Sequence, residues 1–223
     1  MHVQNETTRR LHALFAEEWA YEMHEQPVWA SERGDMRGAD RWDDVGLRAQ
    51  ARRDAHYKQV LASLHAIARS ELSREDALSY DLFRLRYEEA VEGQRFRLYL
   101  LPINQRGGIQ TADELADALP FKTRKHFEDW NARLRSFPQY MDQTIELLTE
   151  GARTGITHPK VVMQRVLAQL DKQIVDDPTK SPFFDPYQKA ATSTAASEVS
   201  AAEREQLASE AKRAIASSVV PAF

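Results

Sequence analysis

The seven histidines are the first residues to test for metal binding or proton transfer. A zinc-binding helix of the His-Glu-x-x-His kind places two histidines four residues apart, where both reach one ion. His24 and Glu25 begin this pattern, but the fourth position after His24 is Val28, and Pro27 ends the helix. The other histidines are dispersed along the chain. We interpret all seven as surface or helix-capping residues and predict no metal ligand among them.

Paired carboxylates are a second source of chemistry, because general acid–base catalysis needs two carboxyl groups with separated pKa values. The pairs Glu17–Glu18, Glu88–Glu89 and Asp176–Asp177 suit solvated helix faces or helix ends. The sequence has no cysteine, which excludes thiolate and disulfide chemistry. It also has no nucleophile elbow, phosphate-binding loop or dinucleotide fingerprint. We therefore predict no catalytic, metal-binding or cofactor-binding residue in this chain.

The segment 102–110 is the best local candidate for a binding role. Asn104 and Gln105 supply hydrogen-bond donors and acceptors, Arg106 adds a positive charge, and two glycines follow that force a turn. A simpler interpretation is that the amides satisfy the backbone groups of their own loop. Both interpretations predict an ordered turn.

A long irregular segment is predicted at 27–46, and it contains Trp29 and Trp42. Loops of this length in compact domains are usually functional or wrap another element. Trp29 is therefore a further candidate for the wall of a substrate cleft. The simpler interpretation is that both rings hold the loop against the core.

Helices must position these residues, because apolar side chains recur at spacings of three and four along most of the chain. The predicted helices span about 6–25, 47–70, 73–92, 123–151, 159–176 and 201–220. Ser73 and Thr123 are the predicted N-caps of two of them, and Pro138 predicts two helices or a kink within 123–151. We expect an all-α fold, an irregular multi-helix bundle of antiparallel helix pairs, with at most a short strand near 96–103.

The composition fits one globular domain over residues 1–223, with a mobile connection at about 188–202 that is rich in Ala, Ser and Thr. The net charge of −4, with dispersed basic residues, argues against a nucleic-acid partner. No apolar run approaches the ~18–20 residues that span a bilayer. The polar N-terminus has no signal-peptide core, which leaves cytoplasm and periplasm both open.

Six segments carry a family resemblance through their order and spacing. They are Pro27-Val28-Trp29-Ala30-Ser31 through Gly34; Leu78-Ser79-Tyr80-Asp81-Leu82-Phe83; Leu101-Pro102-Ile103-Asn104-Gln105; Arg133-Leu134 with Phe137-Pro138 and Asp142; Gly151 through Gly155-Ile156 with Pro159; and Val220-Pro221-Ala222-Phe223. Together they resemble the N-terminal part of the bacterial family called domain of unknown function 885. The resemblance covers nearly the whole chain.

The resemblance implies a function that the residues alone do not. The family is grouped with helical, zincin-like metallopeptidases whose longer members carry a His-Glu-x-x-x-x-His-like metal segment in their later half. The chain would then be the truncated N-terminal part of a zinc-dependent peptidase-like hydrolase, inert alone, that forms a helical cleft wall or lid near Asn104 and Gln105.

Cofactor and partners follow from the same resemblance. Zinc is expected only in the full-length protein. The implied macromolecular partner is the missing C-terminal region, or a second copy that binds through an exposed apolar face. The implied substrate is a peptide. The alternative is a stand-alone helical protein- or peptide-binding module that uses an apolar groove between helix pairs.

Overall fold

The computed structural model describes residues 6–192 and 198–223. Every regular element in these ranges is helical, and their β-type pairing is limited to one isolated bridge between Asn104 and Gly107. The all-α prediction is therefore confirmed. At most a short strand was expected near 96–103. This region instead contains the end of the 3-10 turn η3 (Gln94–Phe96) and the 3-10 turn η4 (Leu98–Leu100). None of the described helices combines the length and apolar character needed to cross a membrane.

The chain divides into two compact units, each with its own core. Unit 1 comprises Met1–Glu22 and Gly46–Tyr99, and unit 2 comprises Met23–Val45 and Leu100–Phe223. A single domain over 1–223 stays a prediction. The connection expected at about 188–202 overlaps the end of one helix and the start of the next, and its centre, 193–197, lies outside the described residues.

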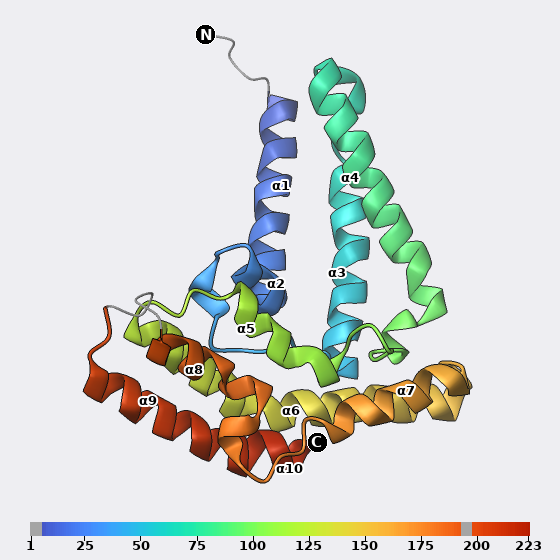
Figure 1. The fold of residues 1–223 in the computed structure, drawn as a ribbon. Helices are drawn as coiled ribbons and strands as arrows, with labels where there is room; N and C mark the ends of the chain where they lie inside the picture. Colours follow the sequence, from blue (N-terminus) through green and yellow to red (C-terminus); the bar gives the residue numbers. More distant parts are fainter. Residues whose placement is uncertain (1–5, 193–197) are drawn as a thin grey trace. The chain divides into compact units, whose positions relative to one another are not determined.

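Unit 1 is built from three long helices, α1 (Glu6–Glu25), α3 (Leu47–His65) and α4 (Arg74–Gly93), with a 3-10 turn η2 (Arg69–Glu71) before α4. Helices α3 and α4 run side by side as the predicted antiparallel pair (Figure 1). The fully or nearly fully buried residues of its core are Leu11, Leu64, Ile67 and Tyr80. The Oγ of Ser73 accepts the backbone N–H of Asp76 at 3.1 Å, which confirms the predicted cap of α4.

Unit 2 is organised around one long helix, α6 (Arg124–Thr154), with α9 (Ala201–Ala214) packed along it (Figure 1). Its other helices are α2 (Pro27–Glu32), α5 (Leu115–Ala118), α7 (Lys160–Asp171), α8 (Asp185–Thr192) and α10 (Val220–Ala222). Its 3-10 turns are η1 (Met36–Gly38), η5 (Ile109–Glu114), η6 (Pro178–Lys180) and η7 (Pro182–Phe184), and a π turn, η9, covers Ile215–Val219.

Helix α6 begins at the predicted cap. The Oγ1 of Thr123 accepts the backbone N–H of His126, and the Nδ1 of His126 accepts the backbone N–H of Thr123 at 3.2 Å, which together form a capping box. The helix continues through Pro138 to Thr154, so the alternative of two separate helices was wrong. Buried apolar side chains on both sides of the proline, such as Phe137 and Met141, hold the helix against the core across the one missing backbone donor.

The segment 27–46 is more regular than its sequence predicted. Pro27 starts α2 instead of only ending α1, because its fixed φ suits the first position of a helix and its missing N–H would be unpaired there anyway. The guanidinium of Arg133, from the middle of α6, donates to the carbonyl oxygens of Arg41 (2.9 Å) and Pro27 (3.2 Å) and to the Oγ of Ser31 (2.8 Å). One fully buried arginine thus ties both ends of this segment to α6.

Trp42 attaches the same segment a second time. Its indole N–H donates to the carbonyl oxygen of Arg133 at 2.8 Å, and its ring stacks on Tyr140 with centroids 5.3 Å apart. The interpretation that this tryptophan holds the loop against the core is confirmed.

The C-terminal part of unit 2 turns inward after the π turn. Pro221, in the first turn of α10, has no backbone N–H to donate. The ring of Phe223 lies 5.2 Å from that of Phe137 and 6.3 Å from that of Phe183. The chain therefore ends against the aromatic core of unit 2.

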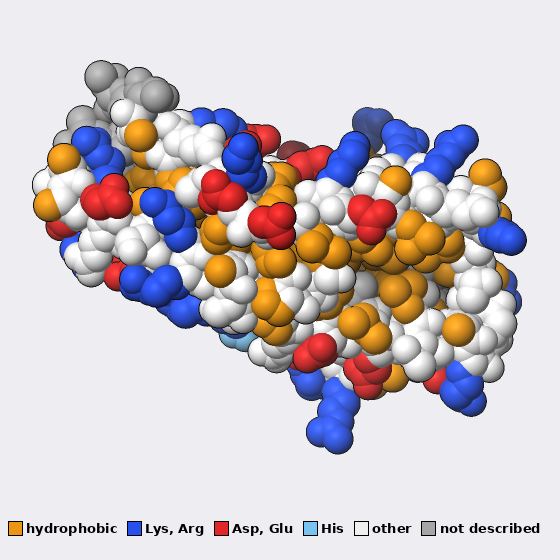
Figure 2. Space-filling model, turned by 60° about the horizontal axis from the view of Figure 1, so that its bottom comes forward, with side chains coloured by type: hydrophobic (Ala, Val, Ile, Leu, Met, Phe, Trp, Pro, Cys, Tyr) orange, Lys and Arg blue, Asp and Glu red, His pale blue; other side chains and the backbone are white. Residues whose placement is uncertain are grey.

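Apolar side chains gather in a hollowed band on the face turned forward in Figure 2, where α6, α7 and α10 of unit 2 lie. Among the large apolar residues of α6 and α7, Ile145, Val161 and Leu167 are each at least half exposed. Contiguous exposed apolar surface of this kind is typical of a face that contacts another protein surface.

Candidate functional site

The predicted binding segment forms a tight, internally bonded turn in unit 2. The backbone N–H of Asn104 donates to the carbonyl of Gly107 (2.9 Å), and that of Gly107 donates back to Asn104 (3.2 Å). The Oδ1 of Asn104 accepts the backbone N–H of Arg106 at 2.9 Å. The side chain of Asn104 therefore does what the simpler interpretation proposed, since it satisfies the backbone of its own loop.

Amide side chains hold this turn from behind. The Nε2 of Gln169, on α7, donates to the carbonyl of Gln105 (3.1 Å), and the Nε2 of Gln110 donates to the carbonyl of Asn104 (2.7 Å). Gln173 extends the network, because its Nε2 donates to the carbonyl of Gln110 at 2.8 Å. These side chains fix the position of the turn relative to α7.

Gly108 allows the backbone of the turn to lie close to Gln110 and Ile103. Its φ of +142° is a conformation that residues with a Cβ rarely adopt. A Cβ at this position would also lie 2.7 Å from the Oε1 of Gln110 and 2.7 Å from the Cγ2 of Ile103. The paired glycines in the sequence were the signal for this turn, whereas the buried glutamines behind it gave none.

Two side chains of the turn remain available for binding. The amide of Gln105 is half-buried and makes no side-chain hydrogen bond to the described part of the chain, and Arg106 is exposed and forms no ion pair with it. An amide can both donate to and accept from a peptide backbone, and a guanidinium can bind a carboxylate through two parallel hydrogen bonds. The turn can therefore recognise a peptide-like ligand without doing chemistry on it.

Trp29, the fourth sequence candidate, lies on a separate element. It belongs to α2, where its side chain is half-buried and the guanidinium carbon of Arg33 lies 4.2 Å from its ring centroid. This is a cation–π contact between the helix and the residue that caps its C-terminus. Asn104, Gln105 and Arg106 thus lie together because they are consecutive in the sequence, whereas Trp29 lies on helix α2.

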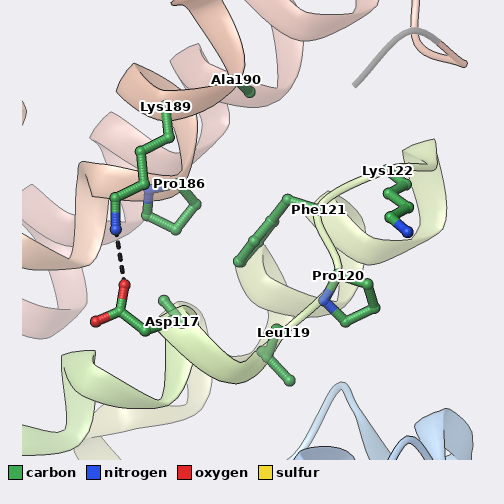
Figure 3. A pocket seen from close by; sticks show the side chains of 9 residues that line it. Asp117, Leu119, Pro120, Phe121, Lys122, Pro186, Lys189 and Ala190 are labelled. Carbon is green, nitrogen blue, oxygen red and sulfur yellow. Dashed lines mark hydrogen bonds and ion pairs between the residues drawn. The ribbon is translucent and has the colours of Figure 1, made fainter. Parts of the chain in front are cut away.

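A pocket of about 260 Å³ in unit 2 is lined by α5, the segment after it and α8 (Figure 3). Phe121 and Pro186 border its interior, and the Nζ of Lys189 donates to the Oδ1 of Asp117 at 2.7 Å along one side. This arrangement suits a small apolar group next to an ion pair. The sequence did not predict it, because its lining comes from segments that lie about seventy positions apart in the sequence.

Unit 1 has a more open groove of about 410 Å³ between α1 and α4. Its lining residues are Phe15, Glu18, Trp19 and Glu22 from α1, and Ser79, Leu82, Phe83 and Arg86 from α4. Trp19 and Leu82 are 53% and 60% exposed. The groove therefore presents large apolar side chains to solvent.

Two carboxylates at the base of this groove are nearly inaccessible. Glu18 is 5% exposed, and its oxygens accept the hydroxyl of Tyr87 at 2.6 Å and approach the Nε2 of His56 at 2.8 and 3.0 Å. Glu22 is 6% exposed and pairs with Arg86. Glu18 had been interpreted as part of a solvated face, and this is wrong, because the aromatic residues of α4 reach across to α1 and cover it.

The comparison with family models covers most of the chain. The family described as "Bacterial protein of unknown function (DUF885)" matches residues 27–223. The chain belongs to this family. No curated protein matches the sequence significantly.

Within the DUF885 family, this chain's described residues do not build a metal site. No group of three or more His, Asp or Glu side chains with metal-binding geometry occurs in the described ranges. The nearest histidine–carboxylate pairs, His56 with Glu18 and His12 with Asp76, each offer two potential ligands where a zinc site needs at least three from the protein. The described residues of this chain thus do not fit a zinc ion.

Proposed function

We propose that this chain forms a non-catalytic, helical wall of the substrate cleft in a zinc-dependent peptidase-like hydrolase. Membership of the DUF885 family and the resemblance to zincin-like metallopeptidases support this proposal. Because the described residues do not fit a zinc ion, metal ligands and the catalytic base would come from other residues of the protein. The contribution of this chain is to bind and orient a peptide.

The turn at Asn104–Gly107 is the observation that carries the proposal. Its backbone is fixed by its own hydrogen bonds and by Gln110 and Gln169, yet Gln105 and Arg106 keep donors and acceptors unengaged. A rigid backbone with free polar side chains binds with little loss of conformational entropy. In the proposed cleft, Gln105 pairs with the substrate backbone and Arg106 with a substrate carboxylate.

The hollowed apolar face of unit 2 has a role in the same proposal. It is where the rest of the polypeptide, or a second copy of the chain, would pack, since exposed apolar side chains gain stability when another surface covers them. Such packing would extend the cleft wall beyond the present chain.

The test uses the polypeptide as its native host makes it. We expect that it contains zinc and hydrolyses peptides, and that Gln105→Ala and Arg106→Ala each raise KM about tenfold while kcat changes little. This pattern follows because the two side chains bind substrate and transition state alike. Steady-state kinetics with a peptide that ends in a free carboxylate measures both constants.

Arg48→Ala is the matched control, because Arg48 is an exposed arginine on α3, in unit 1, away from the turn in sequence. It should leave KM unchanged. A native polypeptide without zinc and without peptide hydrolysis would refute the hydrolase part. Equal KM values for Arg106→Ala and Arg48→Ala would refute the role of the turn.

A second candidate function, a stand-alone helical peptide- or protein-binding module, is favoured by the groove between α1 and α4. An apolar groove between two helices is a common docking site for a partner helix. This function predicts that the 223-residue chain binds a peptide by itself, with no contribution from metal or from other regions.

A further inference from the structure

Helix α4 carries two apolar faces, although a helix in a small unit needs only one. One face packs in unit 1 and comprises the buried Tyr80 and Tyr87 and the partly buried Phe83. The other points to solvent and comprises Leu78, Leu82 and Leu85, which are 60%, 60% and 51% exposed. The outer leucines follow one another at spacings of four and three, which is the pattern of a helix that packs against a partner helix.

The outer face of α4 borders the groove that α1 completes. Leu82 lines the groove from α4, and Phe15 and Trp19 line it from α1. The ring of Phe15 packs on Phe83 with centroids 4.7 Å apart, so the base of the groove is closed by aromatic side chains. The groove is thus bounded by two helices, and large apolar side chains make up about half of its lining.

Two carboxylates, Glu18 and Glu22, and one arginine, Arg86, line this groove. Both oxygens of Glu18 are engaged by Tyr87 and His56, and one oxygen of Glu22 pairs with Arg86. The Oε2 of Glu22 has no hydrogen-bond partner in the described part of the chain. Burial raises the pKa of Glu22, the charge of Arg86 lowers it, and the neighbouring Glu18 raises it further. A second cation at Oε2 would stabilise the ionised form of this carboxyl group.

We infer that the groove binds an amphipathic helix of a partner polypeptide that carries a lysine beside its apolar stripe. The apolar side chains of that helix pack on Leu82 and Phe15 in the groove, and Leu78 and Leu85 extend the exposed face of α4 next to Leu82. The lysine stem lies along the exposed ring of Trp19, and its ammonium donates to the Oε2 of Glu22. This inference rests on the second proposed function, the binding module, and names its partner.

Calorimetric titration of the 223-residue chain with two synthetic peptides tests the inference. Both are designed amphipathic helices with leucines at spacings of three and four, and they differ at one flanking position, which is lysine in one and norleucine in the other. We expect the lysine peptide to bind about tenfold more tightly, because its ammonium forms a charge-assisted hydrogen bond to a shielded carboxylate. In the Glu22→Gln variant the two affinities should become nearly equal.

Leu82→Glu should weaken both peptides at least tenfold, because it places a charge in the apolar contact. Leu98→Glu is the matched control, since Leu98 is 66% exposed, lies in unit 1 and does not line the groove. It should leave both affinities unchanged.

Three results would overturn the inference, and they are distinguishable. Equal binding of the two peptides to the wild-type chain refutes the proposed contact between the lysine and Glu22, while the function as a binding module stands. If neither peptide binds, both the proposed partner helix and the function as a binding module are refuted. Dimers of the free chain that Leu82→Glu dissociates and Leu98→Glu does not would mean that a second copy occupies the groove.

Discussion

His126 has a structural role that depends on its protonation state. Its Nδ1 accepts the backbone N–H groups of Lys122 and Thr123, both at 3.2 Å, and this is possible only while that nitrogen carries no proton. Burial lowers the pKa of His126 below its ordinary value of 6.5. The first turn of α6 is therefore stabilised by a neutral histidine.

The stability of the protein should consequently fall as the pH drops through about 6.5. The unfolded chain takes up the proton first, because its histidine has the higher pKa, so unfolding is favoured by acid in this window. The variant His126→Gln keeps an acceptor at the same position but does not titrate. We expect its free energy of unfolding, relative to wild type, to increase between pH 7.5 and pH 5.5 in urea titrations.

His126→Ala serves as the control for the cap itself. It should cost about 1 kcal/mol at pH 7.5, since it removes the acceptor altogether, and less at pH 5.5, because wild type has by then lost part of the histidine's contribution. A difference between His126→Gln and wild type that is the same at both pH values would contradict the assigned role of the neutral imidazole.

At the scale of elements, Arg133 decides whether the segment 27–46 stays attached to α6. It is fully buried without a carboxylate in hydrogen-bond contact, and burial lowers its pKa to about 10, so it remains charged at neutral pH. Replacing it by methionine removes the guanidinium donor from the carbonyl of Arg41 and from the Oγ of Ser31, while the carbonyl of Pro27 keeps only the hydroxyl of Ser31 as a side-chain donor. We expect Arg133→Met to lower the free energy of unfolding by on the order of 3 kcal/mol.

Limited proteolysis provides the local measurement for this prediction. Cleavage within 33–46 should become faster in Arg133→Met, because that segment loses its main attachment. Arg135→Met is the matched control, since Arg135 is an exposed arginine two positions further along the same helix. Equal cleavage rates in the two variants would contradict the role given to Arg133.

The elements that the sequence predicted well are those with local signals. Ser73 and Thr123 mark helix starts because a capping side chain bonds to backbone three residues away. Helix α2 was missed because Pro27 both follows one helix and begins the next, and the sequence alone indicates only the interruption. The clamp at Arg133 was missed because its three acceptors lie about a hundred positions away in the sequence.

The same distinction applies to the candidate site. The turn at 104–107 was predictable from its glycines and amides, and its own hydrogen bonds are local. The roles of Gln110, Gln169 and Gln173 were not predictable, because glutamine is mostly exposed in proteins and nothing in the neighbouring sequence indicates these contacts. The groove in unit 1 was anticipated only as an apolar space between helices, without the two carboxylates that give it a charge.

At the scale of the whole molecule, the two units share one continuous helix. Helix α1 runs from Glu6 to Glu25, across the boundary after Glu22. Because backbone hydrogen bonds in a helix link residues four apart, unfolding one unit removes partners from the last turn in the other. The single domain predicted from the sequence therefore implies one cooperative unfolding transition.

Core variants in each unit test this organisation. Leu64→Ala in unit 1 and Leu134→Ala in unit 2 each truncate a fully buried side chain and should cost about 2–5 kcal/mol. If the chain unfolds as one domain, both shift the same transition in urea, followed by circular dichroism. Two transitions, with each variant moving only one of them, would contradict the single-domain prediction.

The π turn at Ile215–Val219 has a further consequence, which concerns chain length. Such a turn holds one residue more than the α-helical turn it replaces. Removing a residue here would restore ordinary helical phase and rotate everything after it by about 100° around the helix axis. Phe223 would then leave Phe137 and Phe183. A homologue that is one residue shorter at this place must therefore fill the aromatic core from a different position. An alignment that slides the final helix by one residue would pair side chains that point about 100° apart around the helix axis.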